Sequence, residues 1–115
     1  MPETNPSFLN GVPEMLVLRL ISEREMYGYE LVQTIRARSG VAISFGEGVI
    51  YPVLHALERS GALAARRKSV NGRSRVYYTL TPAGAQRLAD LTGTWSRLTQ
   101  AVQTILAGAP HAEPL

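Results

Sequence analysis

The chain has 115 residues, of which 45% are hydrophobic and 18% charged, and its formal net charge is +3. This length supports one domain with a real core but leaves little room for a large catalytic cleft. The absence of cysteine excludes disulfides and thiolate metal sites. There is no signal-peptide pattern, and no apolar run approaches the roughly 18 residues of a membrane span, so we expect a cytoplasmic protein without membrane contact.

Basic residues are concentrated in the second half of the chain. The first 58 residues hold seven acidic and four basic side chains, whereas no acidic residue lies between Arg59 and Arg87. Such asymmetry indicates a nucleic acid or another anionic partner, and a solvated charged face is the alternative. Five basic residues of this stretch fall within ten positions: Arg66, Arg67, Lys68, Arg73 and Arg75.

Three helices are predicted in the first half of the chain. Apolar spacing favours helices over residues 10–22, with Pro13 in the first turn, and over residues 27–38. Ser44 and Glu47 have the spacing of a capping box for the third helix, although Pro52 allows a start nearer Gly48. Its expected core face is Ile50, Val53, Leu54 and Leu57, and its expected exposed face is Glu47, Gly48, Tyr51, His55 and Arg59.

A β-hairpin is predicted next, with strands over residues 62–70 and 74–80. Asn71-Gly72 between them favours a type I′ turn, which needs a positive φ at both central positions. Alternation along the second strand places Val76, Tyr78 and Leu80 on one face and Arg75, Tyr77 and Thr79 on the other. The basic residues therefore lie on a protruding two-stranded finger.

The last helix is expected to begin at Thr81 as N-cap and to reach about residue 107. At 1.5 Å per residue it would be about 39 Å long, more than a small domain can cover. We therefore expect it to pair with a second copy of the chain, although packing only on its own domain is the alternative. The expected seam has heptad spacing: Leu88, Leu91, Trp95, Leu98, Val102 and Ile105.

Together these elements predict a mainly α fold with a small β-hairpin, namely a winged helix-turn-helix with a long C-terminal dimerisation helix. The expected parts are a flexible N-terminal segment (1–9), a DNA-binding domain (10–80), the dimerisation helix (81–107) and a flexible tail (108–115). In such a domain the third helix enters the major groove of DNA and the hairpin contacts the flanking backbone.

Six segments share their order and spacing with one known family. They are Phe8–Gly11, Tyr27–Leu31, Glu47–Leu54, Leu57–Gly61, Asn71–Tyr78 and Leu80–Gly84. Over residues 8–106 the chain thus resembles the PadR-like transcriptional regulators, and its single C-terminal helix resembles their compact subfamily. The resemblance implies a homodimeric DNA-binding regulator, usually a repressor of nearby genes, that in some members is released by small aromatic or phenolic compounds or drugs.

Specific residues are expected to carry this function. The DNA contacts are assigned to Gly48, Tyr51 and His55 of the third helix and to Lys68, Arg73 and Arg75 of the hairpin. At most one of Arg66 and Arg67 should reach DNA, because alternation sends them to opposite faces. Trp95 is either core or, by resemblance to drug-binding members, part of a paired-indole site for a flat aromatic ligand.

Two other function classes compete with this interpretation. The first is a winged-helix protein-interaction module whose basic hairpin meets an acidic partner without DNA. The second is an enzyme, which we do not expect, because the sequence shows no catalytic constellation and no phosphate-binding glycine loop. No cofactor or metal is expected either, since the second histidine, His111, lies in the tail.

Overall fold

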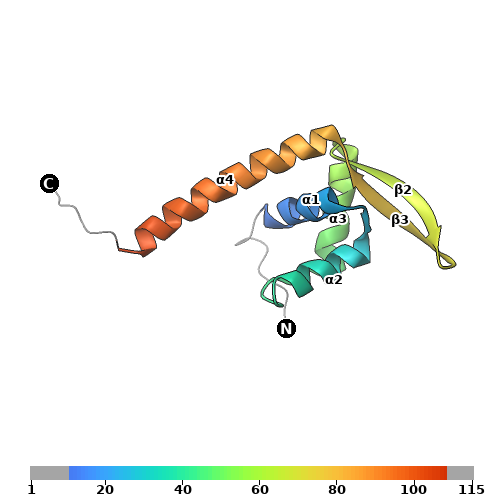
Figure 1. Cartoon of the computed structure of the whole chain (residues 1–115), viewed down its shortest axis with the longest axis horizontal. Helices are drawn as coiled ribbons and strands as arrows, with labels where there is room; N and C mark the ends of the chain where they lie inside the picture. Colours follow the sequence, from blue (N-terminus) through green and yellow to red (C-terminus); the bar gives the residue numbers. More distant parts are fainter. Residues whose placement is uncertain (1–10, 109–115) are drawn as a thin grey trace.

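A computed structural model describes residues 11–108, which form three short helices, a two-residue strand, a hairpin and one long helix (Figure 1). The hairpin projects from one side of the helical core, and the long helix leaves on the other side. This is the mainly helical winged-helix fold that the sequence predicts. The expected flexible segment 1–9, residues 109–115 of the expected tail and His111 lie outside the described residues.

The first two helices supply much of the core. Helix α1 spans Val12–Glu23 and begins after Gly11, with Pro13 in its first turn as predicted. Helix α2 spans Gly28–Arg38, and the amide of Tyr27, its N-cap, donates to Glu30 Oε1 at 3.4 Å. Their apolar faces meet helix α3, so that Val17, Leu18, Leu31, Ile50 and Leu54 are completely shielded from solvent.

Helix α3 spans Glu47–Arg59 and continues through Pro52. The expected capping box is wrong, because the N-cap is Gly46 and no side chain caps the helix there. Ser44 lies two positions too early to cap it. The amide groups of Val49 and Ile50 donate instead to the Gly46 carbonyl, at 3.0 and 3.1 Å. The helix thus begins one residue before the alternative start at Gly48, with its first turn hydrogen-bonded to backbone.

The hairpin belongs to a three-stranded antiparallel sheet of order β1-β3-β2. Strands β2 (Leu63–Val70) and β3 (Arg73–Leu80) are joined through Asn71 and Gly72, whose φ angles of 51° and 78° confirm the predicted turn. Strand β1, Met26–Tyr27, was not predicted, since two residues are too short for a periodic signal. We call the hairpin of residues 63–80 the wing.

Both faces of β3 are packed near the base of the wing. Tyr77 keeps only 8% of its surface, almost as little as Tyr78 on the opposite face. Strand β1 causes this, because it pairs with β3 and brings the ring of Tyr27 to 5.3 Å from that of Tyr77 in an edge-on contact. The base of the wing is therefore packed on both faces, and the free part of the hairpin begins beyond it.

Helix α4 spans Pro82–Leu106, and Thr81 is its N-cap as predicted. The Thr81 hydroxyl accepts from the Gly84 amide at 3.0 Å and donates to the Gly61 carbonyl at 2.6 Å, after the end of α3. A Cβ on Gly84 would lie 2.1 Å from the Ala62 carbonyl oxygen. Three elements therefore meet here with no space for a side chain.

This close contact predicts a strong effect of a single methyl group. Gly84→Ala should lower the free energy of unfolding by about 3 kcal/mol, since neither backbone segment can move freely. Gly93→Ala on the same helix is the matched control, because its Cβ would have only Arg97 Nη1, at 3.5 Å, as a neighbour. That change should stabilise by about 1 kcal/mol through helix propensity. Urea denaturation followed by circular dichroism measures the free energy of unfolding of both variants. Equal changes in the two variants would contradict the close contact at Gly84.

Candidate nucleic-acid interface

An open groove runs between helix α3, the start of α2 and the wing. Its volume is about 430 Å³, and each of the three elements contributes polar side chains to it. Four of the predicted contact residues line it, namely Tyr51, His55, Arg73 and Arg75, whereas Gly48 and Lys68 do not. The contribution of the β1–α2 junction was not predicted. The groove is lined mainly by Tyr27, Gly28 and Tyr29, by Tyr51 and His55, and by Arg67, Arg73 and Arg75.

Helix α3 presents a surface that a DNA groove can approach. Glu47, Gly48, His55 and Arg59 are all exposed, as expected for this face. Around Gly48 the space is open, because a Cβ there would meet nothing within 4 Å. The backbone of the first helical turn is thus accessible, which suits a contact with a phosphate or a base edge.

Tyr51 connects α3 to the start of α2. Its ring packs so closely on Gly28 that a Cβ there would lie 2.4 to 2.6 Å from the ring and hydroxyl atoms. Burial and the nearby Glu47 carboxylate raise the pKa of Tyr51, whereas a hydrogen bond with the Tyr29 backbone lowers it. Tyr51 is therefore neutral at pH 7, and its phenol both joins two helices and borders the groove.

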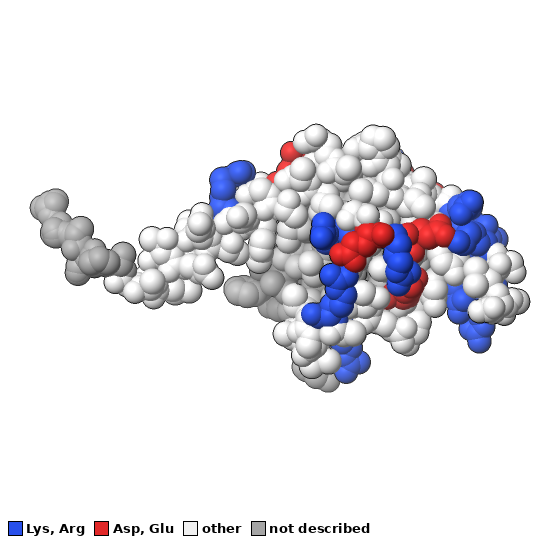
Figure 2. Space-filling view, in the orientation of Figure 1, with Lys and Arg blue, Asp and Glu red and all other residues white. Residues whose placement is uncertain are grey.

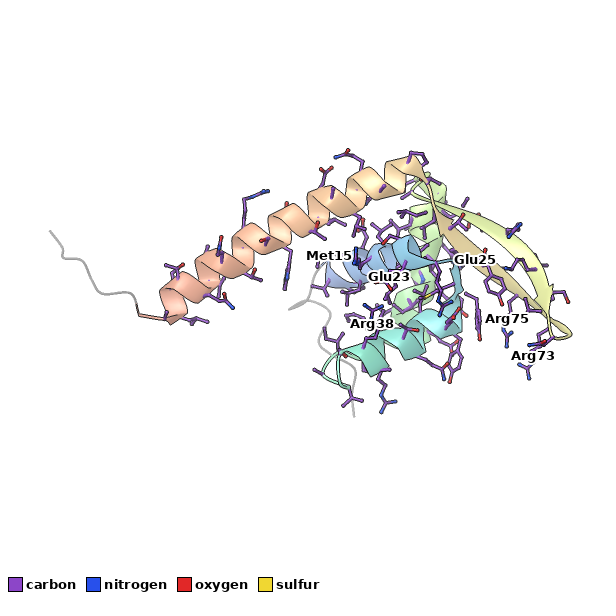
Figure 3. All side chains as sticks on the ribbon, in the orientation of Figure 1. Met15, Glu23, Glu25, Arg38, Arg73 and Arg75 are labelled. Atoms are coloured by element: carbon purple, nitrogen blue, oxygen red, sulfur yellow. The ribbon has the colours of Figure 1, made fainter. Side chains whose placement is uncertain are left out.

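The wing contributes its cations at different distances from the turn. Arg73 is exposed beside the turn, and Arg75 is half-buried, with its guanidinium carbon 4.3 Å from the ring centre of Tyr27. In Figure 3 both side chains lie on the side of the wing that faces the domain body. Stacking on an aromatic ring leaves the edges of a guanidinium free to bind an anion.

Lys68 is placed differently from Arg73 and Arg75. Its ammonium group lies 4.4 Å from the ring centre of Tyr77 and forms an ion pair with Glu25, just before β1. Arg66 joins the same carboxylate at 3.5 Å. The hydrogen bond from Lys68 holds the pKa of Glu25 below its usual value, so the carboxylate is ionised at neutral pH. A DNA contact by Lys68 stays a prediction that requires this ion pair to open.

Arg67 lies at the groove although the sequence did not single it out. Its Nη1 donates to Ser74 Oγ at 3.2 Å across the hairpin, while Arg66 lies on the other face of the sheet. Strand alternation separates the two arginines, as predicted. Alternation did not show that Arg67 borders the groove, because Arg73 and Arg75, which also line it, lie on the opposite face with Arg66 and Lys68.

The expected seam on α4 divides into two parts. Leu88 and Leu91 pack against the core of their own domain. Beyond them the seam is open, with exposed fractions of 45% for Trp95, 57% for Leu98 and 79% for Ile105. Trp95 and Leu98 border a cavity of about 140 Å³ between α4 and the start of α1.

The charges of the described residues are unevenly distributed. In Figure 2 basic side chains gather over the wing, whereas acidic ones lie over the domain body beside other basic groups. Glu23, for example, pairs with both Arg19 and Arg38. Within residues 11–108 we find no cluster of side chains that could hold a metal ion. None of the helices in that range is long and apolar enough to cross a bilayer.

Comparison with known proteins identifies the family. The model of the "Transcriptional regulator PadR-like family" matches residues 17–90, more than half of the chain. The chain belongs to the PadR-like family. It is 33% identical over 104 residues to the transcriptional regulator Rv3488 of Mycobacterium tuberculosis, an alignment that covers 90% of this chain and 92% of that protein. It is thus a transcriptional regulator of the PadR-like family.

Solved structures agree with this assignment. A PadR family transcriptional regulator from Eggerthella lenta is 29% identical, with a TM-score of 0.75 over 87% of this chain and 86% of that one. The PadR-like regulator BC4206 from Bacillus cereus is 30% identical, with a TM-score of 0.76 over 87% and 96% of the two chains. The similarity therefore includes the wing and the long helix.

The contact between Gly28 and Tyr51 makes a testable prediction about the groove. Gly28→Ala should destabilise the fold by about 2 kcal/mol, because the added methyl group displaces the ring. In a Tyr51→Ala background the same change should cost close to nothing, since the clashing ring is absent. Chemical denaturation of the two single variants and the double variant gives the coupling energy. Additive effects would show that the Tyr51 ring is not the reason why position 28 requires glycine.

Proposed function

We propose that this PadR-like regulator binds double-stranded DNA as a homodimer and represses transcription in the cytoplasm. The observation that supports this most strongly is the groove, where the exposed face of α3 and the wing arginines border one space. A duplex offers both a groove for α3 and phosphates for the wing. The proposal assigns Gly48, Tyr51 and His55 on α3, and Arg73 and Arg75 on the wing, to DNA contacts.

The two sets of contacts have different tasks. Arginine side chains that neutralise phosphates release counterions, which contributes affinity without reading sequence. Base edges are read instead by α3, where His55 is an exposed donor and acceptor and Glu47 can accept from cytosine N4. Arg67 adds a third wing arginine to the backbone contacts. Affinity and sequence discrimination therefore reside on separate elements.

The dimer is proposed from the open part of the α4 seam. Leu98, Val102, Ile105 and Leu106 are each more than half exposed, although they lie on one helix and are apolar. Apolar side chains at heptad spacing are stabilised when a second helix covers them. Two copies related by a two-fold axis would present two α3 helices to half-sites about 34 Å apart, one helical turn of DNA.

The proposed effector is a small aromatic or phenolic molecule at Trp95. Ligand pockets usually measure about 300–1,000 Å³, so the 140 Å³ cavity beside Trp95 is too small to be a complete site. A second subunit that covers this region would enlarge the site and bring a second indole. We therefore propose that such a ligand binds between the two subunits, beside the paired indoles, and that its binding releases the dimer from DNA.

Salt dependence tests the assignment of the wing. Replacing Arg73 and Arg75 by alanine should weaken binding to all duplexes alike and make the salt slope shallower by about 0.9 for each phosphate that the wing no longer neutralises. Arg97→Ala is the control, because this arginine is exposed on α4 away from the groove. Fluorescence anisotropy at salt concentrations from about 50 to 200 mM measures the slope. Wild-type protein that binds no duplex at low salt would reject DNA binding and favour a protein partner.

Sedimentation tests the dimer. Leu98→Glu should produce monomers, since it places a charge in the proposed seam while the 57% exposed side chain contributes little to the domain itself. Arg97→Glu, one position earlier and outside the seam, should leave the dimer intact. If dimers persist in both Leu98→Glu and Ile105→Glu, the seam is wrong. Circular dichroism confirms that each variant remains folded.

A further inference from the structure

One face of the wing carries two basic residues directly opposite each other. In the register of the hairpin, Lys68 on β2 pairs with Arg75 on β3. Like charges at such a cross-strand pair repel each other, and this destabilises the hairpin unless other groups neutralise them. The structure separates the two charges by turning each toward a different partner.

Aromatic rings and one carboxylate provide these partners. Arg75 stacks on Tyr27, whereas Lys68 extends over Tyr77 and reaches Glu25. The two tyrosine rings contact each other edge to face, with an interplanar angle of 73°. Lys68 thus runs from the outer strand back across the sheet toward the domain body. Lys68 is not among the residues that line the groove, whereas Arg73 and Arg75 are.

Glu25 is well placed to hold Lys68 in this position. Both side chains are only 28% exposed, so the pair is less screened by water and salt than a fully exposed one. Arg66, the second cation on the carboxylate, has a side chain that is 67% exposed and lies farther from it. Lys68 is consequently the cation that Glu25 removes from the wing surface.

We propose that Glu25 is a positioning residue that keeps Lys68 off the DNA backbone and so limits the affinity of the wing for duplexes of any sequence. This inference rests on the proposed DNA binding. In each wing, only the arginines that line the groove then remain available to contact phosphates. A lysine released onto phosphate would strengthen binding without reading bases, so a wing without Glu25 holds random DNA more tightly.

The experiment compares three variants of the full chain on a random-sequence duplex over a range of salt concentrations. Glu25→Gln removes the charge but keeps the shape, and it should raise affinity about tenfold at low salt and steepen the salt slope by about 2 for a dimer. Lys68→Met alone should change affinity by less than about twofold. The double variant should behave like Lys68→Met, because the gain requires the released lysine.

Several outcomes would overturn the inference while leaving DNA binding intact. Binding of the duplex by the wild-type protein establishes the DNA binding on which the inference rests, and the variants are compared with it. No gain in Glu25→Gln, or a gain that persists in the double variant, refutes the role of Glu25 on Lys68. A loss in Lys68→Met as large as that in Arg75→Met also refutes it, and this comparison remains decisive if Glu25→Gln does not fold.

Discussion

The contact of Gly84 with the Ala62 carbonyl is the constraint on which the arrangement of the molecule depends. Helix α3 ends just before Ala62, the wing begins just after it, and α4 starts two residues before Gly84. Thr81 reinforces the contact, because its amide donates to the Ala62 carbonyl at 3.1 Å and its hydroxyl bonds Gly61. Helix α3, the wing and the long helix are thus oriented by one junction of backbone atoms.

In the proposed dimer, this junction lets the long helix set the distance between the two DNA-binding domains. A symmetric DNA site fixes the distance between two recognition helices, so the direction in which α4 leaves the domain must be fixed as well. A flexible connection would let each domain bind independently, and the second contact would benefit from proximity alone. Leu88 and Leu91 add apolar packing to the start of α4. The outer part of the helix remains free for a partner (Figure 1).

The sequence predicts those features that depend on local spacing. The Asn71-Gly72 turn, the four helices and the cap at Thr81 each follow from a few neighbouring residues, and the structure has all of them. The capping box at Ser44 failed although its spacing was correct, because the loop after α2 brings Gly46 to the cap position. Spacing alone cannot show where a loop places its backbone.

Other parts of the candidate site could not be predicted because they join distant segments. Strand β1 has two residues, yet it buries Tyr77 and places Tyr27 under Arg75. Glu25 lies 43 positions from Lys68 in the sequence, so a run of basic residues looks uniform until the fold brings the carboxylate to it. The same holds for Gly28, whose requirement for glycine arises from the ring of Tyr51.

These distant contacts share a physical role. Tyr27, Tyr51 and Tyr77 each hold a neighbouring group in place, namely the guanidinium of Arg75, the start of α2 and the ammonium of Lys68. Long cationic side chains lose conformational entropy when they bind, at a cost of about 0.5–1.5 kcal/mol each. A ring that already restricts Arg75 reduces this loss. In the proposed DNA complex, the affinity contributed by the wing therefore depends on how its charges are held as well as on their number.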